Sequence, residues 1–286
     1  MSSTTKSTET IRVTADARVC PICGSAEFAP VCEVRGFAYV GCAGCRSVRQ
    51  FPYPSDADIS RFYADYYAKK STDRGYLSEA AFAGFQNDKQ HTFSDLGLAG
   101  DAFADRSVLD VGCGTGQFVQ MMAGRAKSVE GIDVSAECID IARSNALNCS
   151  LKDFLSVTSK YDVITMWHVV EHLREPRSYL EQAHRVLNPG GWLLVETPVI
   201  GAISRSFGAS WRYYLPVEHL NLFTQQSLFN ACAEAGFDVR RWVRFGSGNT
   251  AGTVPDANKR AMDRIAKQYG FGDTMAVWLV RRESKE

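Results

Sequence analysis

The sequence predicts an α/β fold built on a doubly wound, mostly parallel sheet with a ligand site at one edge. The first observation is the run 108–116, in which a short apolar strand passes into glycines at alternate positions. The second is that further short apolar stretches follow along the chain at 129–133, 161–167 and 187–195. Such stretches, bounded by turn residues, are typical of buried strands.

The glycine run predicts a turn that approaches a ligand. Gly112, Gly114 and Gly116 remove side chains where a ligand lies against the main chain, and glycine tolerates the unusual dihedrals of such a turn. A helix that begins near Gly116 would direct its free N–H groups at the same ligand. The spacing is G-x-G-x-G, which differs from the G-x-G-x-x-G of dinucleotide folds. Taken alone, the run also fits a plain structural turn.

The elements that follow favour the ligand-binding interpretation. The stretch 129–133 is expected to form a second strand, and Asp133 stands where doubly wound folds place an acid on a ribose hydroxyl pair. Asp153 and Phe154 follow a short third strand. The remaining expected elements are a fourth strand at 161–167, a helix end with a tight turn and a fifth strand at 187–195, a helix at 225–235, a strand at 237–245, a helix at 255–269 and a strand at 274–281.

In this order and at this spacing, the glycine turn, the acid after the second strand and the turn Asn188–Gly191 resemble class I S-adenosylmethionine-dependent methyltransferases over roughly residues 80–286. The resemblance implies a seven-stranded Rossmann-like sheet whose last strand is antiparallel. It also implies that Gly112 and Gly114 meet the methionine part, that Asp133 binds the ribose, and that Asp153 and Phe154 frame the adenine. The full set of expected cofactor contacts is Asp110, Gly112, Gly114, Gly116, Asp133, Asp153, Phe154 and Trp167.

Composition narrows the possible partners. The 286 residues carry 32 basic and 32 acidic side chains, and no basic run has interleaved aromatics, so we expect a small-molecule substrate and no nucleic acid. No apolar stretch reaches membrane-spanning length, so we expect no membrane partner and a cytoplasmic protein. The oligomeric state is not predicted. The expected parts are a disordered tail at 1–18, a knuckle module at 19–50, a helical cap at 51–98 and a methyltransferase domain at 99–286 with a substrate-covering insertion at about 198–224.

Four cysteines predict a structural zinc site. They form two C-x-x-C pairs, each on a tight turn, and two such pairs make a closed tetrahedral set of four thiolates. A metal site of this kind stabilises a module that is too small to bury an adequate hydrophobic core. The alternative is a pair of reduced cysteine turns in a β-hairpin. The predicted ligands are Cys20, Cys23, Cys42 and Cys45.

An aromatic helix is expected after the knuckles. Ser55 and Asp56 are suited to cap a helix that runs to about Tyr67, and a second helix is expected at about 78–96. The order of these parts resembles that of a group of bacterial methyltransferases that modify sugars, lipids and secondary metabolites. The parts are a cysteine head, an aromatic helix and the methyltransferase core. In that group the helical segment covers the cofactor and shapes the substrate pocket. The alternative is that these aromatics are ordinary core residues.

Catalytic chemistry is expected beyond the carboxyl ends of the fourth and fifth strands. The first stretch is 167–172, in which His168, Glu171 and His172 would share one helical turn, and the second is 211–219. The candidate catalytic residues are Glu171, His172 and His219. The candidate substrate-binding residues are Tyr63, Tyr66, Tyr67, His168, Trp211, Arg212, Tyr213 and Tyr214.

Two mechanisms fit these residues. An oxygen or nitrogen nucleophile would lose its proton to His172 or His219. An alkene carbon would attack first and leave a carbocation, which Glu171 would deprotonate between aromatic walls. The alternative is that each histidine only forms structural hydrogen bonds and that Glu171 only orients His172.

The favoured substrate is a prenyl diphosphate, because the sequence as a whole resembles bacterial methyltransferases that methylate geranyl diphosphate on an alkene carbon. Basic residues of the covering segments would hold a diphosphate together with Mg²⁺. The alternative is that these residues are ordinary solvated surface charges. The alternatives are a nucleotide-linked sugar or another hydroxylated metabolite, and a non-catalytic cofactor-binding protein. The basic residues are Arg61, Lys69, Arg74, Arg205 and Arg212.

Overall fold

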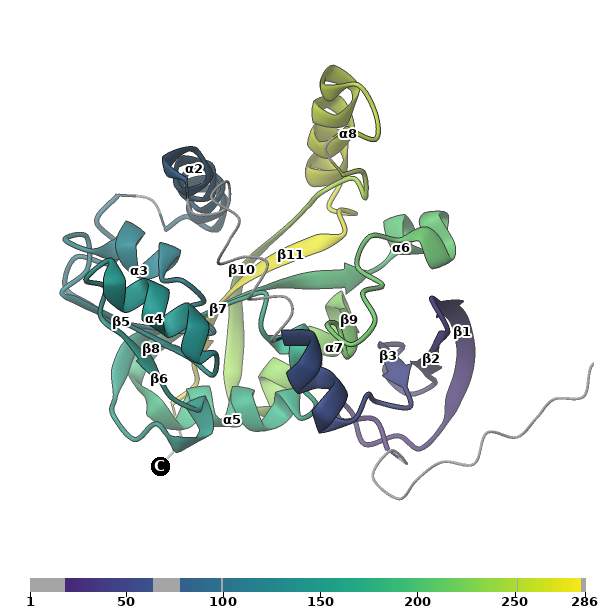
Figure 1. Ribbon diagram of the computed structural model, residues 1–286, viewed down its shortest axis with the longest axis horizontal. Coiled ribbons are helices and arrows are strands. Elements are labelled where there is room, and N and C mark those ends of the chain that lie inside the picture. Colours follow the sequence, from purple (N-terminus) through teal and green to yellow (C-terminus); the bar gives the residue numbers. More distant parts are fainter. Residues whose placement is uncertain (1–18, 64–77, 99, 251, 284–286) are drawn as a thin grey trace, which may run out of the picture.

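A computed structural model describes residues 19–63, 78–98, 100–250 and 252–283 (Figure 1). The predicted tail 1–18 lies outside the described residues, as do Tyr66, Tyr67, Lys69 and Arg74. Among the described residues, none of the helices combines the length and the apolarity that crossing a bilayer requires.

A mixed sheet forms the centre of the molecule. Its strands run in the order β6-β5-β4-β7-β8-β11-β10, in which β11 is antiparallel to both of its neighbours and the first five strands are parallel. This is the Rossmann-like α/β fold that the sequence predicted. The strands are β4 Ser107–Val111, β5 Ser128–Asp133, β6 Cys149–Leu151, β7 Tyr161–Trp167, β8 Leu187–Ile200, β10 Phe237–Phe245 and β11 Thr274–Arg281.

Helices cover both faces of this sheet because its buried strands place apolar side chains alternately on each side. On β4, Val108 joins the core beneath α2 and α3, whereas Leu109 joins the core beneath α5 and α7. The helices are α2 Glu79–Leu96, α3 Gln117–Met122, α4 Ala136–Ser144, α5 Pro176–Val186, α6 Ala202–Phe207, α7 Gln225–Glu234 and α8 Asp256–Gln268, with short 3₁₀ turns η2 Phe154–Ser156, η3 Val170–His172 and η4 Gly208–Ser210.

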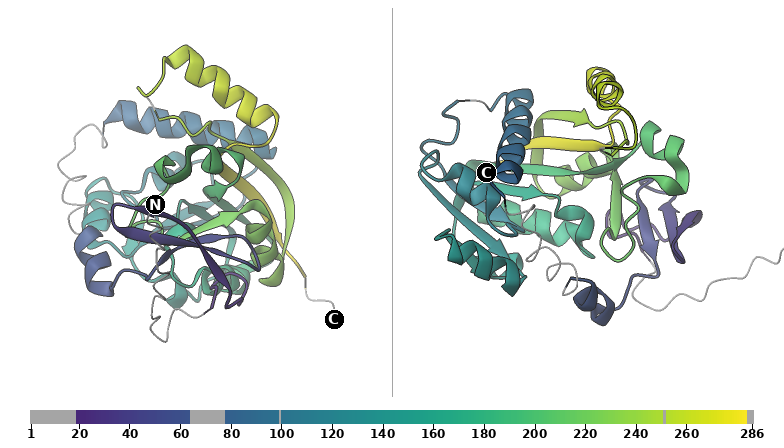
Figure 2. Two further views of the ribbon diagram at one scale, coloured as in Figure 1. Left: turned by 90° about the vertical axis from the view of Figure 1, so that its right-hand side faces the viewer. Right: turned by 45° about the horizontal axis from the view of Figure 1, so that its top comes forward.

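Helix α2 has sharply defined ends. The Ser78 side chain accepts a hydrogen bond from the backbone N–H of Ala81, which satisfies one of the free donors of the first turn. Gly97 closes the helix in the left-handed conformation, with φ of 75°. The helix lies across the top of the sheet beside α8 (Figure 2), so its inner face looks onto the edge where the parallel strands end.

The cysteine head is not a separate layer. Its strands β1 Phe28–Val34, β2 Phe37–Cys42 and β3 Val48–Phe51 form an antiparallel sheet, and β3 pairs with β9 Asn221–Thr224. Strand β9 in turn pairs with the end of β8 (Figure 1). Within the described residues, the sheet therefore has eleven strands rather than the predicted seven. The sequence prediction missed this because the connecting strand lies inside the expected insertion 198–224.

Candidate active site

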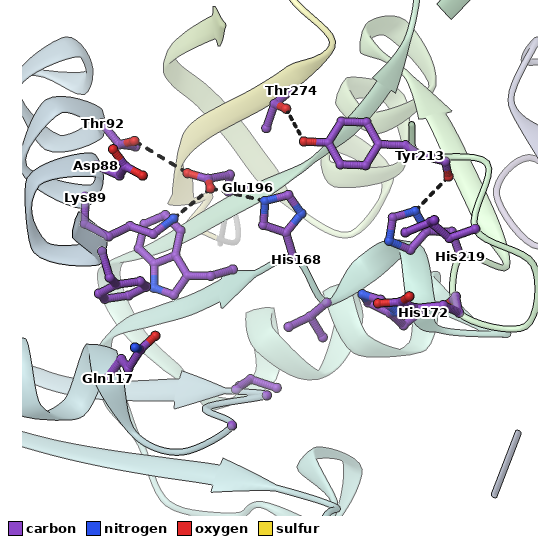
Figure 3. Close-up of a pocket in the computed structure, with 18 of the residues that line it drawn as sticks. Asp88, Lys89, Thr92, Gln117, His168, His172, Glu196, Tyr213, His219 and Thr274 are labelled. Carbon is purple, nitrogen blue, oxygen red and sulfur yellow. Dashed lines mark hydrogen bonds and ion pairs between the residues drawn. The ribbon is translucent and has the colours of Figure 1, made fainter. Parts of the chain in front are cut away.

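A large cavity opens where the parallel strands end. It has a volume of about 1850 Å³ and extends from the turn after β4 to the inner faces of α2 and α8. Single small-ligand sites generally have volumes of about 300–1,000 Å³, so this cavity has room for two small molecules side by side. Figure 3 shows the part of its wall that α2, β8, the segment after β7 and the segment before β9 contribute.

The glycine turn forms one end of the cavity. Gly112 and Gly114 line it and have φ of 69° and 52°, values that favour glycine. A Cβ atom on Gly114 would meet nothing within 4 Å, so the space beside that residue is open. Asp133 also lines the cavity, and its two carboxylate oxygens accept the backbone N–H groups of Gly114 and Ser135 at 2.8 and 2.9 Å. The end of β5 is thereby fixed against the turn.

Three of the predicted cofactor contacts do not line the cavity. Gly116 packs inward, because a Cβ there would lie 2.6 Å from Leu147. Asp110 is buried and accepts a hydrogen bond from the Thr165 hydroxyl at 2.6 Å. The Asp153 side chain caps η2 by accepting from the backbone N–H of Leu155. These three residues stabilise the elements around the cavity. Phe154 and Trp167 do line it.

A chain of buried charges crosses the floor of the cavity. Lys89 on α2 contacts Glu196 on β8, with 2.7 Å between Nζ and Oε1, and Thr92 donates to the other oxygen of Glu196 at 3.5 Å. The same Oε1 of Glu196 lies 3.4 Å from Nε2 of His168 (Figure 3). The ring of Trp167 lies 4.1 Å below the Lys89 ammonium group. A helix of the cap is thus tied to the strand end by side chains that also face the cavity.

His168 is held between two carboxylates. Its Nδ1 lies 2.9 Å from Oε1 of Glu171, and its side chain remains 37% exposed toward the cavity. Burial opposes protonation, but hydrogen bonds to Glu171 and Glu196 outweigh it and raise the pKa of His168 to about 9. His168 is not helical, contrary to the prediction: its φ is 55°, and only residues 170–172 form a 3₁₀ turn. The raised pKa makes His168 a cationic hydrogen-bond donor at neutral pH.

Glu171 lies beneath the cavity wall and is fully buried. One of its oxygens accepts from His168 and the other from the Thr197 hydroxyl at 2.9 Å. Burial alone would raise the pKa of Glu171, but the hydrogen bond and charge of His168 hold it near 2. The predicted base is therefore an ionised carboxylate that does not line the cavity.

His172 and His219 line the cavity beside Glu171. Nδ1 of His172 lies 2.8 Å from the carbonyl oxygen of Glu218, and Nδ1 of His219 lies 2.9 Å from that of Tyr213. A carbonyl only accepts, so each Nδ1 carries a proton and donates it. The two rings meet edge to face with centroids 4.9 Å apart. Burial and the neighbouring His172 lower the pKa of His219 to about 3, so its Nε2 presents a lone pair.

Some predicted substrate residues line the cavity and others do not. Tyr63, His168, Arg212 and Tyr213 line it. Trp211 and Tyr214 instead pack against the head in a buried cluster with Tyr39, Val48 and Leu222. Trp211 is 1% exposed and donates its indole N–H to Asp273 at 3.0 Å. Trp211 and Tyr214 fasten the insertion to the head and do not form a pocket wall.

Those predicted diphosphate-binding residues that the structure describes do not converge. Arg212 forms two hydrogen bonds with the carboxylate of Asp273, at 3.0 and 2.8 Å. Arg61 is exposed and contacts Asp58, and Arg205 lies on exposed α6 away from the cavity. The described residues of this set therefore provide no clamp for a diphosphate and its Mg²⁺.

The four predicted zinc ligands do converge. Their sulfur atoms lie within 4.8 Å of one another, with Cys20 and Cys45 sulfurs 3.7 Å apart and Cys23 and Cys42 sulfurs 3.5 Å apart. Tetrahedral Zn–S bonds of about 2.3 Å place sulfurs about 3.8 Å apart, whereas a disulfide would bring them to about 2 Å. The arrangement suits one zinc ion.

The sequence interpretation missed Lys89, Glu196 and Thr197. Glu196 and Thr197 directly follow the apolar core of the fifth strand, at the edge where chemistry was expected, so their position was a usable signal. Lys89 lies on a helix with a weakly amphipathic pattern, and nothing in its local sequence distinguishes it from a surface lysine.

The strand order, the antiparallel β11 and the glycine turn at a cavity define a methyltransferase that uses S-adenosylmethionine. The family described as "Methyltransferase domain" matches residues 79–241, more than half of the chain, and the chain belongs to this family.

Curated relatives and solved structures agree with this assignment. Ubiquinone biosynthesis O-methyltransferase of Paraburkholderia phytofirmans is 32% identical over 104 residues, which cover 33% of this chain and 45% of that protein. The protein of the same name from Pseudomonas paraeruginosa is 34% identical over 111 residues, covering 35% of this chain and 46% of that protein. The chain spans about half the length of the curated relatives it matches.

Two solved structures share the fold at low identity. One is a complex of the Haloferax volcanii Trm112 methyltransferase activator with a methyltransferase, with a TM-score of 0.55 and 16% identity over 73% of this chain and 97% of that chain. The other is a Thermotoga maritima methyltransferase, described as a possible histamine N-methyltransferase, with a TM-score of 0.53 and 16% identity over 78% of this chain and 98% of that chain.

Proposed function

We propose that this methyltransferase acts on a hydroxyl oxygen of a small molecule, with His172 or His219 accepting the proton. The observation that carries the proposal is a group of three acceptors: the ring nitrogens of His172 and His219, which line the cavity, and the buried Glu171 carboxylate behind them. Their nearest atoms lie within 4.8 Å of one another. Both oxygens of Glu171 are already hydrogen-bonded, whereas the Nε2 atoms of the two histidines face the cavity as acceptors, and the hydroxyl of a substrate supplies a donor for them.

The proposed cofactor site is the glycine end of the cavity. Asp133 uses one acceptor position on each oxygen for backbone N–H groups, so positions remain for two ribose hydroxyls. Gly112 and Gly114 allow the main chain to approach the methionine part, and the buried Phe154 lines the cavity where the adenine would lie. S-adenosylmethionine supplies a methyl group on a positively charged sulfur, and the protein supplies alignment and the base.

The proton path follows from the histidine tautomers. With Nδ1 donating to a carbonyl, the Nε2 of His172 or His219 is positioned to accept the hydroxyl proton as the oxygen attacks the methyl carbon. His172 is the better base of the two, because a histidine whose pKa is about 3 holds a proton poorly at neutral pH. His168, held as a cation by Glu171 and Glu196, cannot be that base. It is suited to donate a hydrogen bond to the acceptor and keep its oxygen oriented.

The contacts favour oxygen over an alkene carbon. Glu171, the base that carbon methylation would need, is fully buried and both its oxygens are hydrogen-bonded. Two of the expected walls for a carbocation, Trp211 and Tyr214, pack elsewhere. Tyr63, Trp167 and Tyr213, which were also expected as walls, do line the cavity. The relatives named ubiquinone biosynthesis O-methyltransferases are consistent with an oxygen acceptor, over the part of their length that is matched.

The test is a panel of acceptors with methyl-labelled cofactor: catechols, phenols, nucleotide-linked sugars and geranyl diphosphate. We expect label on oxygen, a loss of about 10²–10⁴-fold in kcat for His172→Gln or His219→Gln, and little change in cofactor affinity. His184→Gln, a histidine outside the cavity wall, is the control. Label transferred only to geranyl diphosphate, or full activity in both active-site variants, would refute the proposal.

We also propose that Cys20, Cys23, Cys42 and Cys45 hold one structural zinc ion. The support is the sulfur geometry described above. A closed set of four thiolates leaves no open coordination position, so the ion has no part in the chemistry. Its position matters because Cys45 precedes β3, and β3 pairs with β9, which directly follows the His219 segment.

A further inference from the structure

We propose that Glu171, His172 and His219 form a second metal site, which binds one divalent transition-metal ion at the cavity wall. The three residues each offer one ligand atom, and these atoms lie within 4.8 Å of one another. The site is distinct from the cysteine cluster, which uses sulfur ligands from the head.

The distances suit a shared ion. Metal–nitrogen and metal–oxygen bonds of about 2.0–2.2 Å place neighbouring ligand atoms about 3–4 Å apart. Nε2 of His172 lies 4.0 Å from Oε1 of Glu171. Because Nδ1 of each histidine is already bound to a carbonyl, Nε2 is the nitrogen that each ring presents. Small movements of the side chains would bring all three ligands into range.

Each ligand has the outer partner that metal sites generally provide. Histidine ligands usually donate their other N–H to a carbonyl or carboxylate, which fixes the ring and the tautomer. Here the carbonyls of Glu218 and Tyr213 take that role, at 2.8 and 2.9 Å. Glu171 is itself held by Thr197.

The backbone also holds the two ligand segments together. Leu220 donates its N–H to the carbonyl oxygen of Glu171 at 2.9 Å, which joins the His219 segment to the η3 turn. Val217 has φ of 71°, a strained value for a β-branched residue, and its N–H is held by the Gln50 side chain from β3 at 2.8 Å. Such strain persists only where the surroundings over-determine it, and it clusters at functional sites.

The donor set selects the kind of metal. Two imidazole nitrogens and one carboxylate favour Zn²⁺, Fe²⁺, Co²⁺ or Ni²⁺ over Mg²⁺, which prefers oxygen ligands. His172 and His219 face the cavity, so the remaining coordination positions open onto it. Three protein ligands and an open position are typical of catalytic rather than structural sites. The site stands on this geometry. An ion bound to both Nε2 atoms would leave neither histidine free to take the proton, so in the loaded enzyme the ion would instead lower the pKa of the bound acceptor hydroxyl, whose proton would leave to solvent. That role of the ion rests on the proposed function.

The test is metal binding by the full chain, measured without any acceptor. Protein with its cysteine zinc in place is titrated with Co²⁺ and with Zn²⁺ by calorimetry, and the Co²⁺ spectrum is recorded. We expect one further ion per chain whose spectrum lacks the charge-transfer bands of thiolate ligands. The absence of those bands separates this ion from one bound at the cysteine cluster.

Matched variants locate the ion. His219→Ala and His172→Ala should each weaken Co²⁺ binding by more than the roughly 10–100-fold expected for Thr197→Val, which removes only an outer partner. His184→Ala, on α5 outside the cavity, should bind as the wild type does. Thermal melts of each variant establish that it is folded.

Two results would overturn the inference: no ion beyond the cysteine zinc in wild-type protein, or wild-type affinity in a folded His219→Ala variant. The proposed function fails separately. If Co²⁺ binds as expected but only geranyl diphosphate is methylated, the metal site stands and oxygen methylation does not.

Discussion

Lys89 on helix α2 and Glu196 on strand β8 form a buried ion pair, with 2.7 Å between Nζ and Oε1 and about 5% of each residue exposed. The pair joins a helix of the predicted cap to the strand end beside the catalytic candidates. The same carboxylate oxygen contacts His168, so the position of α2 is linked to the orientation of an active-site ring.

Breaking this pair should destabilise the fold strongly. Removing one partner of a buried ion pair leaves an uncompensated charge and costs about 3–5 kcal/mol. We therefore expect Lys89→Met to lower the free energy of unfolding by that amount, measured by denaturant titration. Lys127→Met, at an exposed lysine, should change it by less than about 0.5 kcal/mol. The double variant Lys89→Met, Glu196→Gln should be more stable than Lys89→Met, and an equal or larger loss would contradict this account.

Local signals predicted one part of this site well. The strand and the alternate glycines are contiguous in sequence, and Asp133 lies 19 residues after Gly114, at the end of the next strand, so their arrangement follows from strand and turn geometry. The two cysteine pairs converge for a similar reason, because each pair sits on its own tight turn and β2 carries the second turn back to the first.

Side chains whose partners are distant in sequence were not predictable in the same way. Trp211 was expected to be a pocket wall, but its indole N–H is bound by Asp273, 62 residues further on. Glu171 was expected to face the substrate, but Thr197 and His168 hold it beneath the wall. Which way a side chain points depends on a backbone detail such as the positive φ of His168, and no sequence pattern indicates that.

Asp110 should make stability depend on pH. Burial raises its pKa from 3.8 to about 7, against the hydrogen bond from Thr165 and the charge of Lys89, while the charge of Asp133 adds to the rise. Between about pH 4 and 7 the folded state keeps a proton that the unfolded state loses, so the free energy of unfolding falls as pH rises through this window. The fall is on the order of 1.4 kcal/mol for each pH unit of the window.

Asp110→Asn removes the titrating group and keeps the shape. The stability of the wild type relative to this variant should therefore decline from about pH 4 to about 7 and be constant above that range. Denaturant titrations at a series of pH values measure the difference. A difference that stays constant across the window, or grows with pH, would show that Asp110 is ionised in the folded protein.

The cysteine cluster should hold zinc in a one-to-one ratio with the chain. Cys42→Ser removes one of four thiolates, so we expect loss of the ion and disorder of the head, with weaker binding of acceptor because β3 is bound to β9. Cys32→Ser, a cysteine between the two pairs and outside the cluster, should keep the metal. Elemental analysis of protein prepared without a chelating tag is the measurement. No stoichiometric metal, or a disulfide found by mass, would exclude this role.

Asp133→Ala should weaken cofactor binding by about 1–3 kcal/mol, because it would remove the proposed charge-assisted hydrogen bond to ribose. Calorimetry with the demethylated cofactor measures this. Asp140→Ala, on the exposed side of α4, is the control. Since Asp133 also holds the backbone of Gly114, a melting curve must show that the variant is folded. Wild-type affinity in a folded variant would place the ribose elsewhere.

The last prediction separates the two glycines of the turn. Both have positive φ, so alanine at either position costs about 1–2 kcal/mol of backbone strain. A Cβ on Gly112 would lie 2.7 Å from a methyl group of Val169, whereas one on Gly114 meets only open space on the cavity side. Gly112→Ala should therefore lower the melting temperature more than Gly114→Ala does.

Gly114→Ala should instead act on the cofactor. Its new methyl group projects into the space that the proposed cofactor site uses, so we expect a folded protein, with a modest loss of stability, whose affinity for the demethylated cofactor falls at least tenfold. Adding Val169→Ala should restore stability to Gly112→Ala, because it removes the clashing methyl groups, and should not restore affinity to Gly114→Ala. Melting curves and calorimetry on the four variants give both quantities. If Gly114→Ala binds cofactor normally, the methionine part does not lie against this turn.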